Sequence, residues 1–138
     1  MTTRILVLVL ALALSACRGL DDPGASAGVF FPRHGLSGPH LLAPLKGVLK
    51  VDAGCLLVVE STGTKRLPIW PGGLGIRRSA AGLEITDPGN RVVAAEGEIV
   101  TLVGGEYPTA AARDLMGRDE PLVCRGYGFW VVAVIRAG

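Results

Sequence analysis

The sequence is poor in charge, aromatic rings and histidine. Charged residues make up 19% of its 138 positions and aromatic residues 5%, and 14 Lys and Arg against 12 Asp and Glu leave a formal net charge of +2. This composition provides no basic surface for nucleic acid, so we expect no nucleic-acid partner. The two His residues, His34 and His40, lie with Asp21 and Asp22 in a stretch without helical or strand spacing. We therefore expect neither a metal site nor a cofactor.

Long apolar runs are also missing. The longest run, residues 5–14, has ten residues, and as a helix it would extend about 15 Å, half the hydrocarbon core of a bilayer. It therefore cannot serve as a permanent transmembrane helix. The chain is rich instead in residues that interrupt regular structure, with 20 Gly and 9 Pro, which disfavours helical bundles and coiled coils. A length of 138 residues is enough for one domain with short appendages.

The N-terminus is typical of a secretory signal peptide. A basic residue, Arg4, precedes the apolar run and two small residues follow it, so residues 1–16 are predicted to be removed. The motif Leu14-Ser15-Ala16-Cys17 resembles the lipobox of bacterial lipoproteins. That resemblance implies diacylglyceryl transfer to the Cys17 thiol, cleavage before Cys17, and anchoring of the chain to the extracytoplasmic face of a bacterial membrane. The alternative is an ordinary secreted protein in which Cys17 only happens to follow the cleavage site.

Residues 17–44 are predicted to be a lipidated N-terminus followed by a tether. Nine of the 27 residues from 18 to 44 are Gly or Pro, and a flexible chain of that length spans roughly 30 Å. Residues 29–31 are three consecutive apolar residues, which would be costly to leave in water. We expect these three residues to dock on the domain, in preference to a membrane or a partner.

Residues 45–138 are predicted to form an all-β domain, because short β-type runs alternate there with turn residues. The clearest hairpin crosses the turn Asp87-Pro88-Gly89-Asn90. The pattern favours a small antiparallel, OB-like barrel with one short helix before the last strand, and the alternative is a two-sheet β-sandwich. The strands are predicted at residues 47–51, 55–60, 66–70, 83–86, 91–94, 98–103 and 128–135, and the helix at residues 109–116.

Two cysteines remain once Cys17 is assigned to lipid, namely Cys55 and Cys124. An extracytoplasmic compartment allows them to form a disulfide. That bond would join the second predicted strand to the start of the last one, and the loop-entropy model gives it ~4 kcal/mol of stabilisation for a loop of this size. Two buried free thiols or a metal-binding pair are the alternatives.

No catalytic arrangement emerges from the sequence. Ser37 and His40 are a candidate nucleophile and base, but a tether cannot hold them within ~3 Å of each other. Asp114, Asp119 and Glu120 are expected to be solvated surface charges. We therefore expect a non-catalytic binding or structural module, and the alternative is a hydrolase-like envelope enzyme whose site the sequence patterns do not reveal.

Two aromatic side chains are candidates for a recognition surface. Trp70 is followed by Pro71, and Tyr127 lies between glycines, so both are placed in predicted loops at one end of the barrel. Tyr and Trp bury large areas with few rotatable bonds, which suits them to binding. We expect Trp70 and Tyr127 to lie close together and partly exposed, available to an envelope protein or a glycan.

Several motifs follow one another in an order that resembles a group of uncharacterised bacterial secreted proteins and lipoproteins. The resemblance covers most of residues 45–138 and implies a small disulfide-bonded β-barrel domain, without implying any activity. The final motif departs from the group, in which it more often reads Gly-Pro-Tyr-Trp. The residues that carry the resemblance are Gly47 with Leu49, Cys55, Trp70-Pro71-Gly72-Gly73, Asp87 to Asn90, Gly104-Gly105-Glu106, and Cys124-Arg125-Gly126 with the aromatic run that follows.

Overall fold

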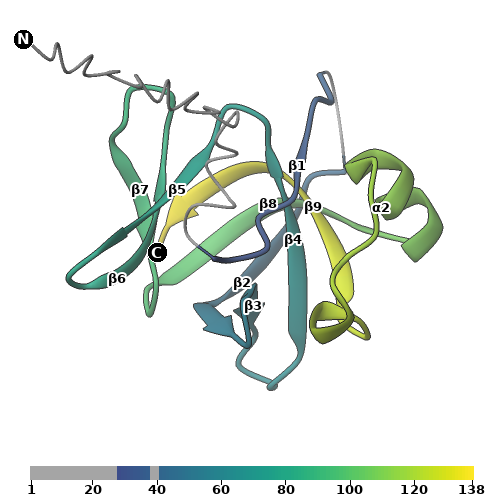
Figure 1. Ribbon diagram of the computed structural model, residues 1–138, viewed down its shortest axis with the longest axis horizontal. Coiled ribbons are helices and arrows are strands. Elements are labelled where there is room, and N and C mark those ends of the chain that lie inside the picture. The colour runs from purple at the N-terminus through teal and green to yellow at the C-terminus, as the bar shows by residue number, and fades with distance from the viewer. Residues whose placement is uncertain (1–27, 38–40) are drawn as a thin grey trace, which may run out of the picture.

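The computed structural model describes residues 28–37 and 41–138, and β-strands dominate it (Figure 1). The predicted signal peptide, residues 1–16, and Cys17 lie outside the described residues. The elements are β1 (Arg33–His34), β2 (Ala43–Asp52), β3 (Cys55–Val59), β4 (Lys65–Pro71), β5 (Gly75–Ser79), β6 (Gly82–Thr86), β7 (Val92–Ala95), β8 (Ile99–Tyr107), α2 (Thr109–Met116), the 3-10 helix η1 (Leu122–Cys124) and β9 (Gly128–Ala137).

Five strands close into a barrel in the order β2, β3, β4, β9, β8. Neighbouring strands are antiparallel except at the closure, where β9 pairs with β4 in parallel and Phe129 lies opposite Leu67. A ring with an odd number of strands needs at least one parallel pair, so a purely antiparallel barrel was not attainable. The all-β, OB-like barrel with one short helix before the last strand is otherwise confirmed.

A second, three-stranded sheet lies beside the barrel, with its strands in the order β5, β6, β7 (Figure 1). The predicted hairpin is present, and Asn90 adopts the positive φ of 62° that the turn requires. Strand β5 was not predicted. The sheet buries one side against the barrel core through Ile76, Leu83, Ile85 and Ala94.

The folded domain begins before residue 45, which corrects the predicted boundary of the tether. Val29 and Phe31 are only 6% and 3% exposed, so the expected docking of the apolar residues is confirmed for these two. Strand β1 pairs in parallel with β4, with Arg33 opposite Trp70. Phe31 also stacks on the Trp70 ring at a centroid distance of 5.6 Å. Apolar burial therefore outweighs the flexibility that the Gly and Pro content suggested.

Apolar side chains form two separate layers. The first fills the barrel and reaches the small sheet, with Leu49, Trp70, Val100 and Trp130 among its members. The second lies on the outer surface of β3, β4 and β9, where α2 and η1 cover it. Its buried members are Cys55, Leu57, Leu67, Ile69, Ala112, Cys124, Phe129 and Val131.

The barrel wall is tight where β8 shifts register against β9, between Val103 and Gly104. A Cβ atom on Gly104 would lie 1.9 Å from the backbone oxygen of Val131. Only glycine permits this approach of the two strands.

Candidate functional site

The expected recognition surface of Trp70 and Tyr127 is not formed. Trp70 has no exposed surface and belongs to the layer inside the barrel. Tyr127 is partly buried and packs against the other layer. The prediction was wrong because Phe31, from the segment assigned to the tether, covers the Trp70 ring.

The predicted disulfide between Cys55 and Cys124 is present, with a Cα–Cα distance of 5.7 Å. Cys55 is the first residue of β3 and Cys124 is the last residue of η1. The bond therefore fastens the segment between β8 and β9 to the barrel wall. We call residues 108–127, which contain α2 and η1, the cover segment.

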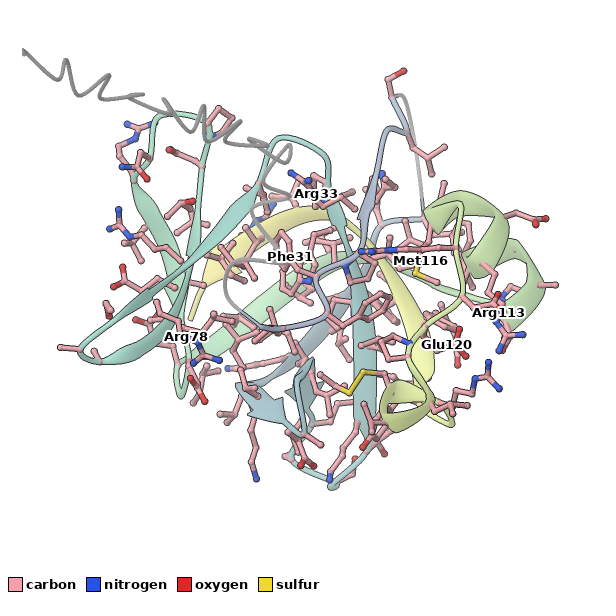
Figure 2. The ribbon with its side chains drawn as sticks, viewed as in Figure 1. Phe31, Arg33, Arg78, Arg113, Met116 and Glu120 are labelled. Atoms are coloured by element: carbon pink, nitrogen blue, oxygen red, sulfur yellow. A yellow bond between two sulfur atoms is a disulfide. The ribbon has the colours of Figure 1, made fainter. Side chains whose placement is uncertain are left out.

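An ion pair holds the cover segment together internally. Arg113 of α2 donates two hydrogen bonds to Glu120, from Nε to Oε2 at 2.9 Å and from the second guanidinium nitrogen to Oε1 at 2.7 Å. Figure 2 shows the two side chains facing each other. The Glu120 side chain is only 3% exposed, which corrects the expectation of a solvated charge. Its hydrogen bond with Arg113 is the main cause that lowers the Glu120 pKa from 4.5 to about 2.

The cover segment occupies the face that OB-type barrels use for ligands. In those barrels, oligonucleotides and oligosaccharides bind on the face of the second and third strands. The equivalent strands here are β3 and β4, and their outward side chains, including Leu57 and Ile69, are buried beneath α2 and η1. The face over β3 and β4 is therefore closed by the chain's own side chains.

An apolar groove of about 540 Å³ lies beside the covered face, over β2 and the adjoining ends of β3 and β8. Its apolar surface comes from three residues that face each other across the strands, because Val48 lies opposite both Val59 and Ile99. Val48 is 38% exposed and Ile99 is 51% exposed. The remaining lining residues are Lys46, Gly47, Lys50, Glu60 and Ser61.

Two lysines flank the groove on β2. Lys46 and Lys50 lie on the same face as Val48, because side chains two positions apart point to the same side of a strand. Among the described residues neither lysine has an ion-pair partner. Glu60 on the opposite side is paired with Arg66 at 3.4 Å. The groove is chemically suited to an apolar segment or chain that also carries negative charge.

The residues considered for metal or nucleophilic chemistry have other roles or lie outside the described part. His34 is 5% exposed, and its Nε2–H donates to the backbone oxygen of Val132 at 2.7 Å while Nδ1 accepts from the Leu36 N–H at 3.2 Å. The His34 side chain therefore contributes hydrogen bonds to the folded domain, which corrects its expected place in the tether. His40, Asp21 and Asp22 are outside the described residues. Within residues 28–37 and 41–138, no three His, Cys, Asp or Glu side chains could share a metal ion.

Comparisons with protein-family models, with curated proteins and with solved structures returned no match for this chain. Within the described residues, no helix has the length and apolarity needed to cross a membrane.

Proposed function

We propose that this chain is a lipid-anchored protein of a bacterial cell envelope, held to the extracytoplasmic face of a membrane by acyl chains on Cys17. The observation that carries the proposal is the motif at residues 14–17, placed directly after a ten-residue apolar run. The disulfide between Cys55 and Cys124 supports an oxidising, extracytoplasmic location, because disulfides are rare in reducing compartments.

The domain at the end of the anchor is a non-catalytic binding or structural module. Its ion pairs, including that of Arg113 with Glu120, lie within the cover segment, between strands or at the turns that join them, and hold the fold. The apolar groove beside Val48 is the surface best suited to a ligand, since the face over β3 and β4 is covered. An envelope component with an apolar, negatively charged portion fits that groove.

Metabolic labelling with a palmitate analogue tests the anchor. Wild type and the control Gly19→Ala, which leaves residues 14–17 intact, are expected to incorporate the label and to fractionate with membranes. Cys17→Ala is expected to lose the label and to keep the uncleaved signal peptide. Equal labelling of wild type and Cys17→Ala would contradict the proposal.

A further inference from the structure

The cover segment displays an apolar tip made of Leu122 and Val123. Leu122 is 76% exposed, the highest exposure of any large apolar side chain in the described residues, and Val123 beside it is 59% exposed. Placing two adjacent apolar side chains in water is costly, and such patches commonly mark contact sites. Because the tip projects from the surface, it suits insertion into a soft apolar phase better than it suits a ligand pocket.

The tip is held in a fixed shape. Within η1 and at its end, the Cys124 N–H donates to the Pro121 oxygen at 2.9 Å and the Arg125 N–H donates to the Leu122 oxygen at 3.2 Å. The disulfide to Cys55 fastens the next residue after Val123 to the barrel. The side chains of the tip are therefore exposed without the ordering cost that a loose loop would add on binding.

The N-terminal segment reaches the barrel at the same end as the tip. The Phe30 N–H donates to the Gly54 oxygen at 2.8 Å, and Phe30 bridges to Cys55. Cys55 is in turn bonded to Cys124, the neighbour of Val123. The described segment nearest to Cys17 in sequence therefore contacts Cys55, and Cys55 is bonded to the residue that follows the tip.

The remaining length of chain keeps this end near the anchor. Ten residues, 18–27, separate Cys17 from the first described residue. Whatever their conformation, ten residues span at most about 36 Å. The anchored end of the domain therefore cannot move far from the lipid headgroups.

Basic side chains accompany the tip. Arg125 follows the tip after Cys124; its side chain is 48% exposed, and its Nε lies 4.0 Å from Oε1 of Glu120. The Arg118 guanidinium lies 5.0 Å from the centre of the Phe30 ring, where the N-terminal segment joins the barrel. Asp119 and Glu120 nearby are both ion-paired with Arg113. The three arginines of the cover segment are balanced by Asp114, Asp119 and Glu120, so the apolar tip carries the membrane contact and the half-exposed Arg125 adds one side chain that can reach a phosphate headgroup.

We propose that the apolar tip inserts into the membrane that carries the Cys17 anchor, and so fixes the orientation of the barrel on the bilayer. The inference extends the proposed function, because the anchor supplies the nearby membrane. The occupant of the tip is the phospholipid interface itself. Insertion of Leu122 and Val123 adds apolar contact to a domain that the anchor alone would leave free to turn.

Quenching of an introduced tryptophan by brominated lipid tests the insertion. In the mature chain from residue 17, with the disulfide formed, Cys17 is the single free thiol and can be coupled to a maleimide lipid in vesicles. The native Trp70 and Trp130 are 0% and 8% exposed, so their emission is shielded. In vesicles of phosphatidylcholine with phosphatidylglycerol, we expect the Leu122→Trp emission to shift to shorter wavelength. We expect brominated lipid in the same vesicles to quench that emission.

Leu42→Trp is the matched control. Leu42 is 70% exposed but precedes β2, whose 10 residues separate it in sequence from the Ala53–Gly54 turn. Its emission is expected to stay unchanged. Equal quenching at both positions, or quenching of Leu42→Trp alone, would overturn the proposal, as would an unquenched Leu122→Trp in a chain with unaltered circular dichroism.

Vesicle partitioning of the uncoupled Cys17→Ser chain gives a second measurement. Replacing both Leu122 and Val123 with Ser is expected to weaken partitioning about tenfold or more. Replacing Val92, which is 44% exposed on β7, with Ser is expected to change nothing. Loss of binding in Ile99→Ser instead would assign the membrane contact to the groove. Neither measurement depends on whether the cell lipidates Cys17, because the quenching experiment uses a synthetic maleimide lipid and the partitioning experiment uses the uncoupled Cys17→Ser chain.

Discussion

Replacing Glu120 with Gln removes the charge that the cover segment buries. The Glu120 pKa is lowered from 4.5 to about 2, chiefly by its hydrogen bond with Arg113, and a shift of that size corresponds to at most ~3 kcal/mol of stability. The Arg113 side chain is 34% exposed, so solvent screens the pair. Asp119, 3.6 Å away, still offers Arg113 a partner. We therefore expect Glu120→Gln to lower the free energy of unfolding by about 1–2 kcal/mol at pH 7.

The effect should depend on pH with a definite sign. Because the folded-state pKa is below the unfolded one, the contribution is complete above about pH 5 and is lost as pH falls toward 2. Urea unfolding of wild type and Glu120→Gln at several pH values measures the difference between their free energies of unfolding. The contributions of the other carboxylates are the same in both proteins and cancel in that difference. Asp119→Asn is the control, since that side chain is 65% exposed, and it should cost under ~0.5 kcal/mol. A difference between wild type and Glu120→Gln that is equally large at pH 7 and pH 3 would refute the electrostatic reasoning.

Two further predictions concern packing and the disulfide. Cys55→Ser combined with Cys124→Ser opens a loop with a sequence separation of 69 and should lower the free energy of unfolding in urea by about 2–4 kcal/mol. Reduced wild type should show the same loss, and an unchanged unfolding midpoint in both proteins would contradict the prediction. Trp70→Ala should cost about 3–5 kcal/mol, because a fully buried ring is removed; a variant with near wild-type stability would restore Trp70 as a surface residue.

Elements with strong local signals were predictable from the sequence. The turn at residues 87–90 contains Pro, Gly and Asn, whose backbone preferences match the reversal between β6 and β7. The helix at residues 109–116 follows Pro108 and ends before Gly117, which adopts the left-handed conformation with φ of 67°. The pairing of Cys55 with Cys124 was predicted from the number of cysteines and the expected compartment. The turn and the helix could be predicted from neighbouring residues, and the disulfide from the number of cysteines.

Elements that depend on distant partners were not predictable in this way. Strand β5 has Arg77 and Arg78 exposed and only Ile76 buried, so its sequence has little β character, and pairing with β6 makes it a strand. The segment with Val29 and Phe31 reads as a tether because its Gly and Pro residues dominate the local pattern. Its burial depends on β4, about 40 residues later in the sequence.

The candidate site was missed for a related reason. The groove combines Val48, Val59 and Ile99, which belong to three strands and meet only through the register of β2 with β3 and β8. Alternation on β2 did carry a signal, since Lys46, Val48 and Lys50 occupy one face. Reading an exposed valine between two lysines as a surface feature would have found half of the groove. The half contributed by Ile99 required the strand order.

In the proposed arrangement, the cover segment contacts the membrane and the groove binds a ligand. In the ring β2, β3, β4, β9, β8, the cover segment lies over β3, β4 and β9, whereas the groove lies over β2 and the ends of β3 and β8. The tip is next to Cys124, which is bonded to Cys55 where Cys55 pairs with Asp52, whereas Val48 pairs with Val59 at the other end of the β2–β3 pairing. Membrane contact and ligand binding can then occur together. The disulfide at Cys124 holds the tip in place and fastens the cover segment to β3.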